Sequence, residues 1–503
     1  MPHKRNLIAN YLGQGWSAAI SLAFIPIYIQ YLGMESYGLI GLFAVLQAWL
    51  ALLDMGLTPT LTREMARFTA GVHSAQFIGD LLYSLEVICF SLATLIGIVI
   101  WAGSSYVAND WLHVEKLPTS VVTEALSIMA LVAALRFCEG IYRGSLFGLQ
   151  QQVWFNVANA TLATLRHGGA VAILIFVSPT IQGFFYWQAL VSLCSIFVLG
   201  LHVHKILPAR ILPASFSMAV VRDIWRFAAG MMGIAFLSIL LTQVDKVILS
   251  RMLTLDAFGI YSLAGTVAGA FYLVVVPITQ ALYPRMVEFV SRDNRSGLIS
   301  IYHVGAQIIT VLTAPIVLLF CFYGENIMFV WSGNESLAKN IAPILTPLML
   351  GTFLNGLMHI PYQLQLAHGW TSFTIKINLV GVTILIPAIL WIVPIYGAEG
   401  AAWIWVTLNA GYVFIAIHFM HRRLLPEVKW RWYKFDLVMP VVGAGLTFFL
   451  LKYFAPVSSG DRVSWIIYLV SIACSMTLIA ILGADQLRSR VGSLLLSLLK
   501  KRI

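Results

Sequence analysis

Residues 31–43 read YLGMESYGLIGLF, and a related segment, MLTLDAFGIYSLA, occupies positions 252–264. The two segments share a glycine at equivalent positions, Gly38 and Gly259. The same register continues without a gap and aligns further pairs along the chain. These pairs are Leu32–Leu253, Glu35–Asp256, Tyr37–Phe258, Leu39–Ile260, Leu52–Leu273, Gly56–Pro277, Leu61–Leu282 and Gly148–Gly369. One ungapped register over such a length predicts an internal repeat.

The composition places this repeat in a membrane. Apolar residues make up 60% of the 503 residues, charged residues only 10%, and the mean hydropathy is +0.87. A soluble domain carries about 25% charged residues, so this chain has too few polar groups to coat a water-exposed globule. The composition excludes an ordinary soluble enzyme, a disordered chain and a coiled coil. The formal net charge of +10 is typical of cytoplasmic loops in a membrane protein rather than of a nucleic-acid surface.

Fourteen segments are apolar and long enough to cross a bilayer as helices. The predicted spans are 10–31, 36–58, 77–101, 118–141, 153–177, 181–203, 223–250, 256–281, 298–323, 341–365, 372–394, 399–420, 435–454 and 463–483. The repeat register that aligns Gly38 with Gly259 carries span 1 onto span 7. Because each half contains an even number of spans, the two six-helix halves are predicted to run parallel. The expected fold is an all-α polytopic membrane protein with two parallel six-helix repeats and two C-terminal helices.

The domain boundaries and the orientation follow from this count. With a cytoplasmic N-terminus, twenty-one Lys and Arg residues fall in cytoplasmic segments and five on the opposite side, so both termini are predicted to be cytoplasmic. The predicted parts are an N-terminal lobe (1–203), a linker (204–222), a C-terminal lobe (223–420), a basic cytoplasmic loop (421–434), helices 13 and 14 (435–483) and an amphipathic tail (484–503). Two like bundles suit alternating access, in which one bundle rocks against the other.

Three stretches resemble a known family: YLGMESYGLIGLF (31–43), LLDMGLTPTLTREMAR (52–67) and QVDKVILSRMLTLDAFGIYSLA (243–264). They are similar to the polysaccharide-export branch of the MOP superfamily, which includes the Wzx-type O-antigen flippases. This resemblance implies a MATE/MOP-like fold in the bacterial inner membrane. It also implies transport of an undecaprenyl-pyrophosphate-linked oligosaccharide to the periplasmic leaflet, a step of lipopolysaccharide biosynthesis.

Arg166 is the most informative charged residue, since it is central in its span and no acidic residue lies three or four positions away. A charge at that depth costs about 2.5–3.5 kcal/mol on insertion scales, so it needs a partner or a function. One interpretation is a cationic point for a pyrophosphate or an anionic sugar, because the arginine fork contacts two phosphate oxygens. The alternative is a structural bridge to Glu86. Near the end of span 4, Arg136, Glu139 and Arg143 can pair along one helix face.

Further polar residues inside spans complete the candidate set. Arg136, Asn156, Asn159, Lys246, Asn355 and Gln363 are candidates for substrate binding, and Asp54, Glu86 and Asp245 are candidates for coupling or gating. For the amides, polar contacts between helices are an equally valid interpretation. Asp54, near the helix perturber Gly56, either carries a coupling proton or ion or caps a broken helix. Asp245 and Lys246 either reach the interface or form a gate.

Two other functions remain open at this point. A cation-coupled multidrug exporter of the same superfamily would favour acidic cavity residues over a central arginine. A membrane polysaccharide polymerase would need carboxylates or metal ligands on large periplasmic loops, so a transporter is preferred over an enzyme. No catalytic residue, metal site or cofactor is predicted, and nucleic acid is not expected as a partner. The expected partners are a coupling proton or sodium ion, a polysaccharide polymerase and chain-length proteins. The sequence leaves the glycan, the coupling ion and the oligomeric state undetermined.

Overall fold

The computed structural model describes residues 2–54, 56–208, 213–454 and 461–489, and for residues 2–8, 53 and 219–235 it describes the backbone only. Within this part of the chain the fold is helical and contains no β-strand; an isolated bridge joins His113 and Thr254. The predicted linker 204–222 and the predicted tail 484–503 lie partly outside the described residues.

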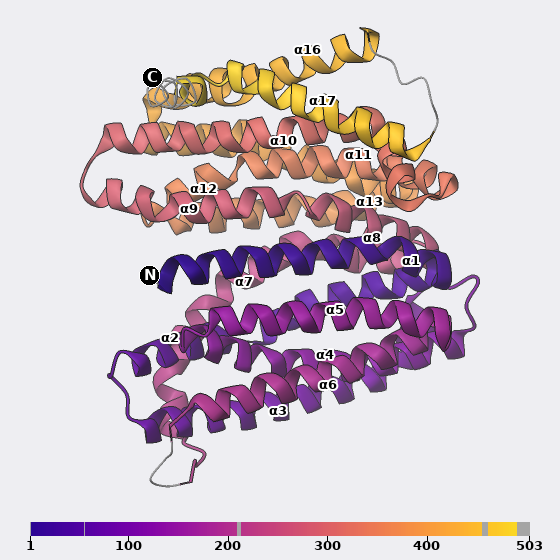
Figure 1. The fold of residues 1–503 in the computed structure, drawn as a ribbon, viewed down its shortest axis with the longest axis vertical. Coiled ribbons are helices and arrows are strands. Elements are labelled where there is room, and N and C mark those ends of the chain that lie inside the picture. The colour runs from indigo at the N-terminus through magenta and orange to yellow at the C-terminus, as the bar shows by residue number, and fades with distance from the viewer. Residues whose placement is uncertain (1, 55, 209–212, 455–460, 490–503) are drawn as a thin grey trace, which may run out of the picture. The chain divides into compact units, whose positions relative to one another are not determined.

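The chain divides into two compact units, residues 1–260 and 261–503, each built from long helices (Figure 1). The first unit contains seven helices and the beginning of an eighth. They are α1 (Pro2–Leu53), α2 (Leu57–Thr69), α3 (Ala75–Tyr106), α4 (Thr119–Gly148), α5 (Gln152–Phe176), α6 (Ile181–Ile206), α7 (Met218–Met252) and the start of α8 (Leu255–Gly269). A short π-helical segment, η1 (Val107–Trp111), extends α3.

The second unit continues from α8 in the same all-helical manner. Its helices are α9 (Tyr272–Ser291), α10 (Arg295–Ser332), α11 (Glu335–Leu357), α12 (His359–Ala367), α13 (Thr371–Gly411), α14 (Ile417–Leu424), α15 (Lys429–Arg431), α16 (Met439–Phe454) and α17 (Arg462–Gly483). Short connecting helical segments are η2 (Tyr412–Ala416), η3 (Pro426–Val428) and η4 (Trp432–Val438).

The helices account for the predicted spans. In the described residues, ten helical stretches are long and apolar enough to cross a membrane, and two of them, Ala9–Leu52 and Thr371–Leu424, are long enough for two spans each. These two stretches kink at glycines with positive φ, Gly33 (80°) and Gly397 (57°), where the sequence predicts a boundary between spans. The helices α5 and α7 fill the places of the fifth and seventh predicted spans, and the hydropathy of α5 is lowered by Arg166 and its polar neighbours. The all-helical, multi-pass architecture is therefore confirmed.

Helix ends recur in the predicted repeat register. The gap between α2 and α3 (70–74) corresponds to the gap between α9 and α10 (292–294), and the end of α5 at Phe176 corresponds to the kink at Gly397. One detail differs from the expectation. Gly56 precedes α2 in the left-handed conformation, but Pro277 lies inside α9, and the corresponding break falls earlier, at 270–271. This recurrence supports the repeat, and superposition of the two halves stays a prediction.

Each unit has an apolar core. In the first unit, buried side chains of α2, α3, α4 and α6 form one cluster that includes Leu61, Leu85, Ile141 and Val203. In the second unit, α16 and α17 pack on α10 through a cluster whose largest member is Phe448. The predicted spans 13 and 14, which are α16 and α17, therefore pack against α10, the ninth predicted span. Large apolar side chains on the outer faces remain exposed, as expected where lipid is the solvent.

Candidate functional site

A cavity of about 360 Å³ lies inside the first unit, between α1, α4, α5 and α6. Its lining contains three arginines and two acidic residues among otherwise apolar and amide side chains. The polar lining residues are Gln47, Asp54, Thr58, Arg136, Glu139, Arg143, Asn159, Arg166 and Ser195. Such a collection of charges within apolar spans is costly, so the cavity is the candidate functional site.

Arg166 is held at the cavity by a carboxylate from the neighbouring helix. One terminal guanidinium nitrogen donates to Glu139 Oε1 at 3.2 Å and lies 3.4 Å from Ser195 Oγ. The predicted alternative of a bridge between Arg166 and Glu86 is wrong. Glu86 lies on α3, where its carboxylate is 3.4 Å from His204 Nε2.

The length of α4 explains this correction. The sequence predicts that span 4 ends at residue 141, which would put Glu139 at the membrane surface. The helix instead continues to Gly148, so Glu139 lies nine residues, or about 14 Å, inside its end. Because α4 and α5 are joined by the short turn after Gly148, this position brings Glu139 within reach of Arg166. A periodic pattern of small residues, Gly140, Gly144 and Gly148, was the available signal that the helix continues.

Arg136 is the second cation in the cavity wall. Its guanidinium donates to Gln188 Oε1 at 2.7 Å and lies 5.1 Å from the centre of the Phe43 ring. Gln188 was not predicted, although a glutamine inside an apolar span is the kind of residue that signals such a contact. In the described part of the chain, the Nε atoms of both Arg136 and Arg166 are buried and have no hydrogen-bond partner. The cavity therefore holds unused cationic donors, which suit an anionic ligand.

Asp54 lies at the cavity beside the interruption between α1 and α2. Its carboxylate accepts hydrogen bonds from Thr58, at 2.9 Å from the hydroxyl and 3.2 Å from the backbone N–H. Gly56, at the start of α2, is in the left-handed conformation with φ of 72°. Asp54 thus caps α2, and it also faces the cavity, so the capping and coupling interpretations are compatible.

The two predicted asparagines of α5 separate. Asn159 lines the cavity and donates to Ser17 Oγ of α1 at 3.2 Å. Asn156 is buried and donates to Asn10 Oδ1 at 2.5 Å, outside the cavity lining. Asn156 therefore fits the interpretation of a polar contact between α5 and α1.

The remaining predicted residues lie away from this cavity. Asp245 and Lys246 are half-buried on α7, where Lys246 Nζ donates to Gln243 Oε1 at 3.2 Å. Two others belong to the second unit: Asn355 on α11 and Gln363 on α12. Asn355 is tied to its surroundings, because it accepts from the Tyr272 hydroxyl at 2.8 Å and donates to Asn409 at 2.8 Å.

A second polar cluster, not predicted from the sequence, joins the two repeat motifs to the loop before α4. The buried carboxylate of Glu35 accepts hydrogen bonds from the backbone N–H groups of Glu115 (2.7 Å), Lys116 (2.9 Å) and Leu117 (2.8 Å). At the equivalent position of the second motif, Asp256 accepts from Lys116 Nζ at 2.7 Å. This pairing raises the pKa of the Lys116 ammonium, through its hydrogen bond to Asp256 and the attraction between the charges.

His113 completes this cluster, because its carbonyl accepts from the backbone N–H of Leu255 at 2.9 Å. We call the set of Glu35, residues 113–117 and Asp256 the motif latch. The signal for it was present in the sequence as two acidic residues at equivalent repeat positions. Their common partner, the loop segment 113–117, is not visible in the sequence, because this loop carries no hydropathy period or motif.

No group of three or more His, Cys, Asp or Glu residues suited to a metal ion occurs among the described residues. All five cysteines are free thiols.

The fold and the cationic cavity define a multi-pass helical membrane transporter. The chain belongs to the family described as polysaccharide biosynthesis protein, whose model matches residues 3–290. A Shigella flexneri protein named as an O-antigen transporter is 22% identical over 80% of this chain and 93% of its own length. The succinoglycan biosynthesis transport protein ExoT of Rhizobium meliloti is 23% identical over 66% of this chain and 63% of its own length.

Solved structures show the same fold at low identity. A multidrug resistance MATE family transporter of the MOP superfamily in an inward-facing conformation superposes with a TM-score of 0.65 at 14% identity, covering 81% of this chain and 94% of its own. The lipid II flippase MurJ in an inward closed conformation gives a TM-score of 0.63 at 13% identity, covering 94% of this chain and 97% of its own. The predicted MATE/MOP-like fold is confirmed.

Proposed function

We propose that this protein is a flippase that moves an undecaprenyl-pyrophosphate-linked oligosaccharide, an O-antigen or related surface polysaccharide unit, across the bacterial inner membrane by alternating access. The observation that carries the proposal is the cavity with three guanidinium groups, two of which keep buried Nε donors without a partner. A pyrophosphate offers several oxygens for such planar, paired donors. The relatives named as an O-antigen transporter and as a succinoglycan biosynthesis transport protein support the same substrate class.

Glu139 gives the cavity a means of binding and releasing the anion. In the absence of substrate it neutralises Arg166, so the buried cation is not left unpaired. An incoming pyrophosphate competes with this carboxylate for the guanidinium. Because one ion pair is exchanged for another, binding is favourable without becoming too tight for release.

The motif latch provides the step that changes access. The positive-inside rule places residues 113–117 on the periplasmic side, so an intact latch closes that end of the cavity. Release of the substrate then requires the backbone N–H groups to leave Glu35. Proton or sodium coupling, with Asp54 nearest the cavity, and contacts with polymerase and chain-length proteins are further parts of the proposal. Cytoplasmic termini follow from the same orientation.

A multidrug exporter is the alternative transporter. The arginine excess in the cavity disfavours it, because organic cations would be repelled. Purified protein in vesicles should translocate a labelled polyprenyl-pyrophosphate oligosaccharide and leave a labelled organic cation in place. A flippase-deficient strain should regain its surface polysaccharide when it carries the gene. Translocation of the cation without translocation of the oligosaccharide would establish the exporter instead.

A further inference from the structure

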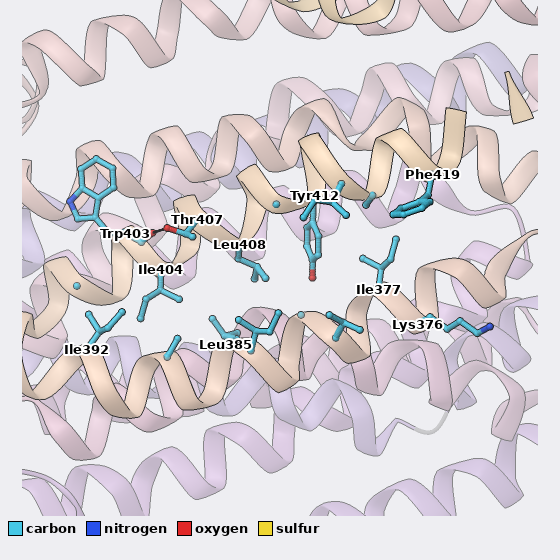
Figure 2. A pocket seen from close by; sticks show the side chains of 18 of the residues that line it. Lys376, Ile377, Leu385, Ile392, Trp403, Ile404, Thr407, Leu408, Tyr412 and Phe419 are labelled. Carbon is cyan, nitrogen blue, oxygen red and sulfur yellow. Dashed lines mark hydrogen bonds between the residues drawn. The ribbon is translucent and has the colours of Figure 1, made fainter. Parts of the chain in front are cut away.

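A second, larger cavity lies in the second unit, between the two arms of α13 on either side of Gly397 (Figure 2). Its volume is about 780 Å³, within the usual range of ligand sites. The first arm lines it with apolar side chains such as Ile384 and Ile392, and the second arm does so with Trp403 and Leu408. This space, which we call the α13 cleft, has no part in the proposed transport path through the first unit.

A polar atom inside the α13 cleft lacks a partner. Tyr412 is only 9% exposed, and its side chain is directed into the space between the arms (Figure 2). Its hydroxyl makes no hydrogen bond to any described residue. An unsatisfied buried hydroxyl destabilises a folded protein, so a ligand acceptor at this position would stabilise the protein. Tyr412 also begins the π-helical segment η2, a feature that is frequent at functional sites.

Cations gather at one mouth of the α13 cleft. Lys376 is part of the lining, and Arg422 and Arg423 lie in the last turn of α14, shortly after the lining residue Phe419. The Arg423 guanidinium lies 4.2 Å from the centre of the Trp370 ring, which joins it to the start of α13. The positive-inside rule places this mouth at the cytoplasmic interface.

The charge at the other end is different. Glu399 lines the cleft two residues beyond Gly397, at the turn between the arms, so the cleft is cationic at one end and acidic at the other. The ligand that fits is amphipathic, with an anionic head at Lys376 and a hydrocarbon chain along the arms. Basic pockets between spans on the cytoplasmic side bind phosphate headgroups in this way.

We propose that the α13 cleft binds an anionic glycerophospholipid. The phosphate lies near Lys376 and Arg422, one acyl chain fills the space between the arms, and an ester oxygen accepts the Tyr412 hydrogen bond. Figure 2 places Tyr412 between the levels of Ile377 and Leu385. Leu385 is nine residues beyond Lys376, so Tyr412 is deeper in the cleft than Lys376 by less than about 14 Å. The flexible lysine and the tyrosine can therefore contact a phosphate and its neighbouring ester together, whereas a polyprenyl chain offers no ester.

Native mass spectrometry of the delipidated full-length protein tests this assignment. Phosphatidylglycerol should bind with higher occupancy than phosphatidylethanolamine, and Lys376→Gln should lower its affinity about fivefold. Ala388→Trp, which fills the cleft, should lower it about tenfold. The matched control is Leu390→Trp, on the same arm but exposed and outside the lining, and it should leave binding unchanged.

The proposed hydrogen bond from Tyr412 to the lipid ester is tested by comparing ester-linked with ether-linked phosphatidylglycerol. The wild type should prefer the ester-linked lipid about fivefold, and Tyr412→Phe should remove that preference. Because Tyr412→Phe removes an unsatisfied buried hydroxyl, the lipid-free variant should be at least as thermally stable as the wild type. Equal effects of Ala388→Trp and Leu390→Trp on lipid affinity would overturn the assignment of the α13 cleft as the lipid site. Tighter binding of a polyprenyl phosphate, together with no difference between ester and ether lipids, would overturn the phospholipid and assign the cleft to an isoprenoid chain.

Discussion

Gly38 and Gly259, which occupy the same position in the two repeat motifs, make reciprocal contacts within the first unit. A Cβ on Gly38 would collide with the backbone oxygen of Leu255, and a Cβ on Gly259 would lie 2.6 Å from the backbone oxygen of Met34. Met34 and Leu255 are themselves equivalent in the repeat register. The contact is therefore reciprocal, which is what the predicted parallel repeat would produce.

Gly259→Ala should separate the two motifs, because the added methyl group cannot fit against the Met34 carbonyl. We expect lower thermal stability in detergent and weaker closure of the periplasmic end. The control is Gly103→Ala on α3, where nothing lies within 4 Å of the new Cβ. That variant should be neutral or gain up to about 1 kcal/mol from helix propensity. Equal stability of the two variants would contradict the close contact.

Glu35→Gln should loosen the motif latch. The carboxylate accepts three backbone N–H groups, and hydrogen bonds to a charged acceptor contribute about 1.5–3 kcal/mol each. In a cysteine-free background, a cysteine at Asn159 in the cavity should react about tenfold faster with an impermeant reagent added outside. Glu115→Gln, which removes an exposed charge from the same loop, should not change this rate. An unchanged rate in Glu35→Gln would show that the latch does not control access.

Glu139→Gln should destabilise the protein by up to about 5 kcal/mol, because it leaves the Arg166 guanidinium buried without its carboxylate. Adding Arg166→Gln should restore much of that stability and still abolish transport, since the cavity has lost a cation. Arg166→Lys should retain partial transport, because the charge survives and the paired donors are lost. Protein level and complementation are measured together. Full transport by the double variant would eliminate the substrate role of Arg166.

Glu64 makes part of the stability dependent on pH. Its carboxylate, buried on α2 outside the predicted spans, pairs with Arg63, Arg67 (3.2 Å) and His73 (2.6 Å). Burial alone would raise the pKa of Glu64, but the hydrogen bonds from His73 and Arg63 and the charges of the arginines bring it below its ordinary value. A carboxyl whose pKa is lowered on folding stabilises the folded state above its unfolded pKa, about 4.3, and loses this contribution as the pH falls through the folded pKa.

Glu64→Gln should therefore lower the melting temperature at pH 7, and the difference from the wild type should shrink below about pH 4.3. Glu288→Gln provides a control, because Glu288 is half-exposed and, among the described residues, forms its ion pair with Arg292 just beyond the end of α9. A difference that stays constant with pH would rule out the ionised Glu64 network as its cause.

Orientation in the membrane is tested with exposed positions at or near helix ends. Cysteines at Asp110 and Ser336 should react with an impermeant reagent outside intact cells, whereas cysteines at Ser74 and Ser296 should react only after permeabilisation. Labelling of Ser296 from outside would invert the assignment for the second half of the chain.

The sequence alone determined the membrane environment, the helical class and the positions of most helix ends. Hydropathy acts locally, so the predicted boundaries between spans 1 and 2 and between spans 11 and 12 fall where the helices kink, at Gly33 and Gly397. Arg166 was singled out for the same reason, since a charge within an apolar span is visible without any neighbour. The acidic residues of the two motifs, Glu35 and Asp256, also stood at matching positions.

Only the tertiary structure decided which side chains meet. Arg166 pairs with Glu139 rather than Glu86, because α4 continues past its predicted end and the packing of α4 against α5 brings the two charges together. The backbone N–H groups that hold Glu35, and the unpartnered hydroxyl of Tyr412, depend on how distant segments pack. Hydropathy and periodicity describe one helix at a time, whereas an ion pair or a cavity depends on the depth and rotation of several helices at once.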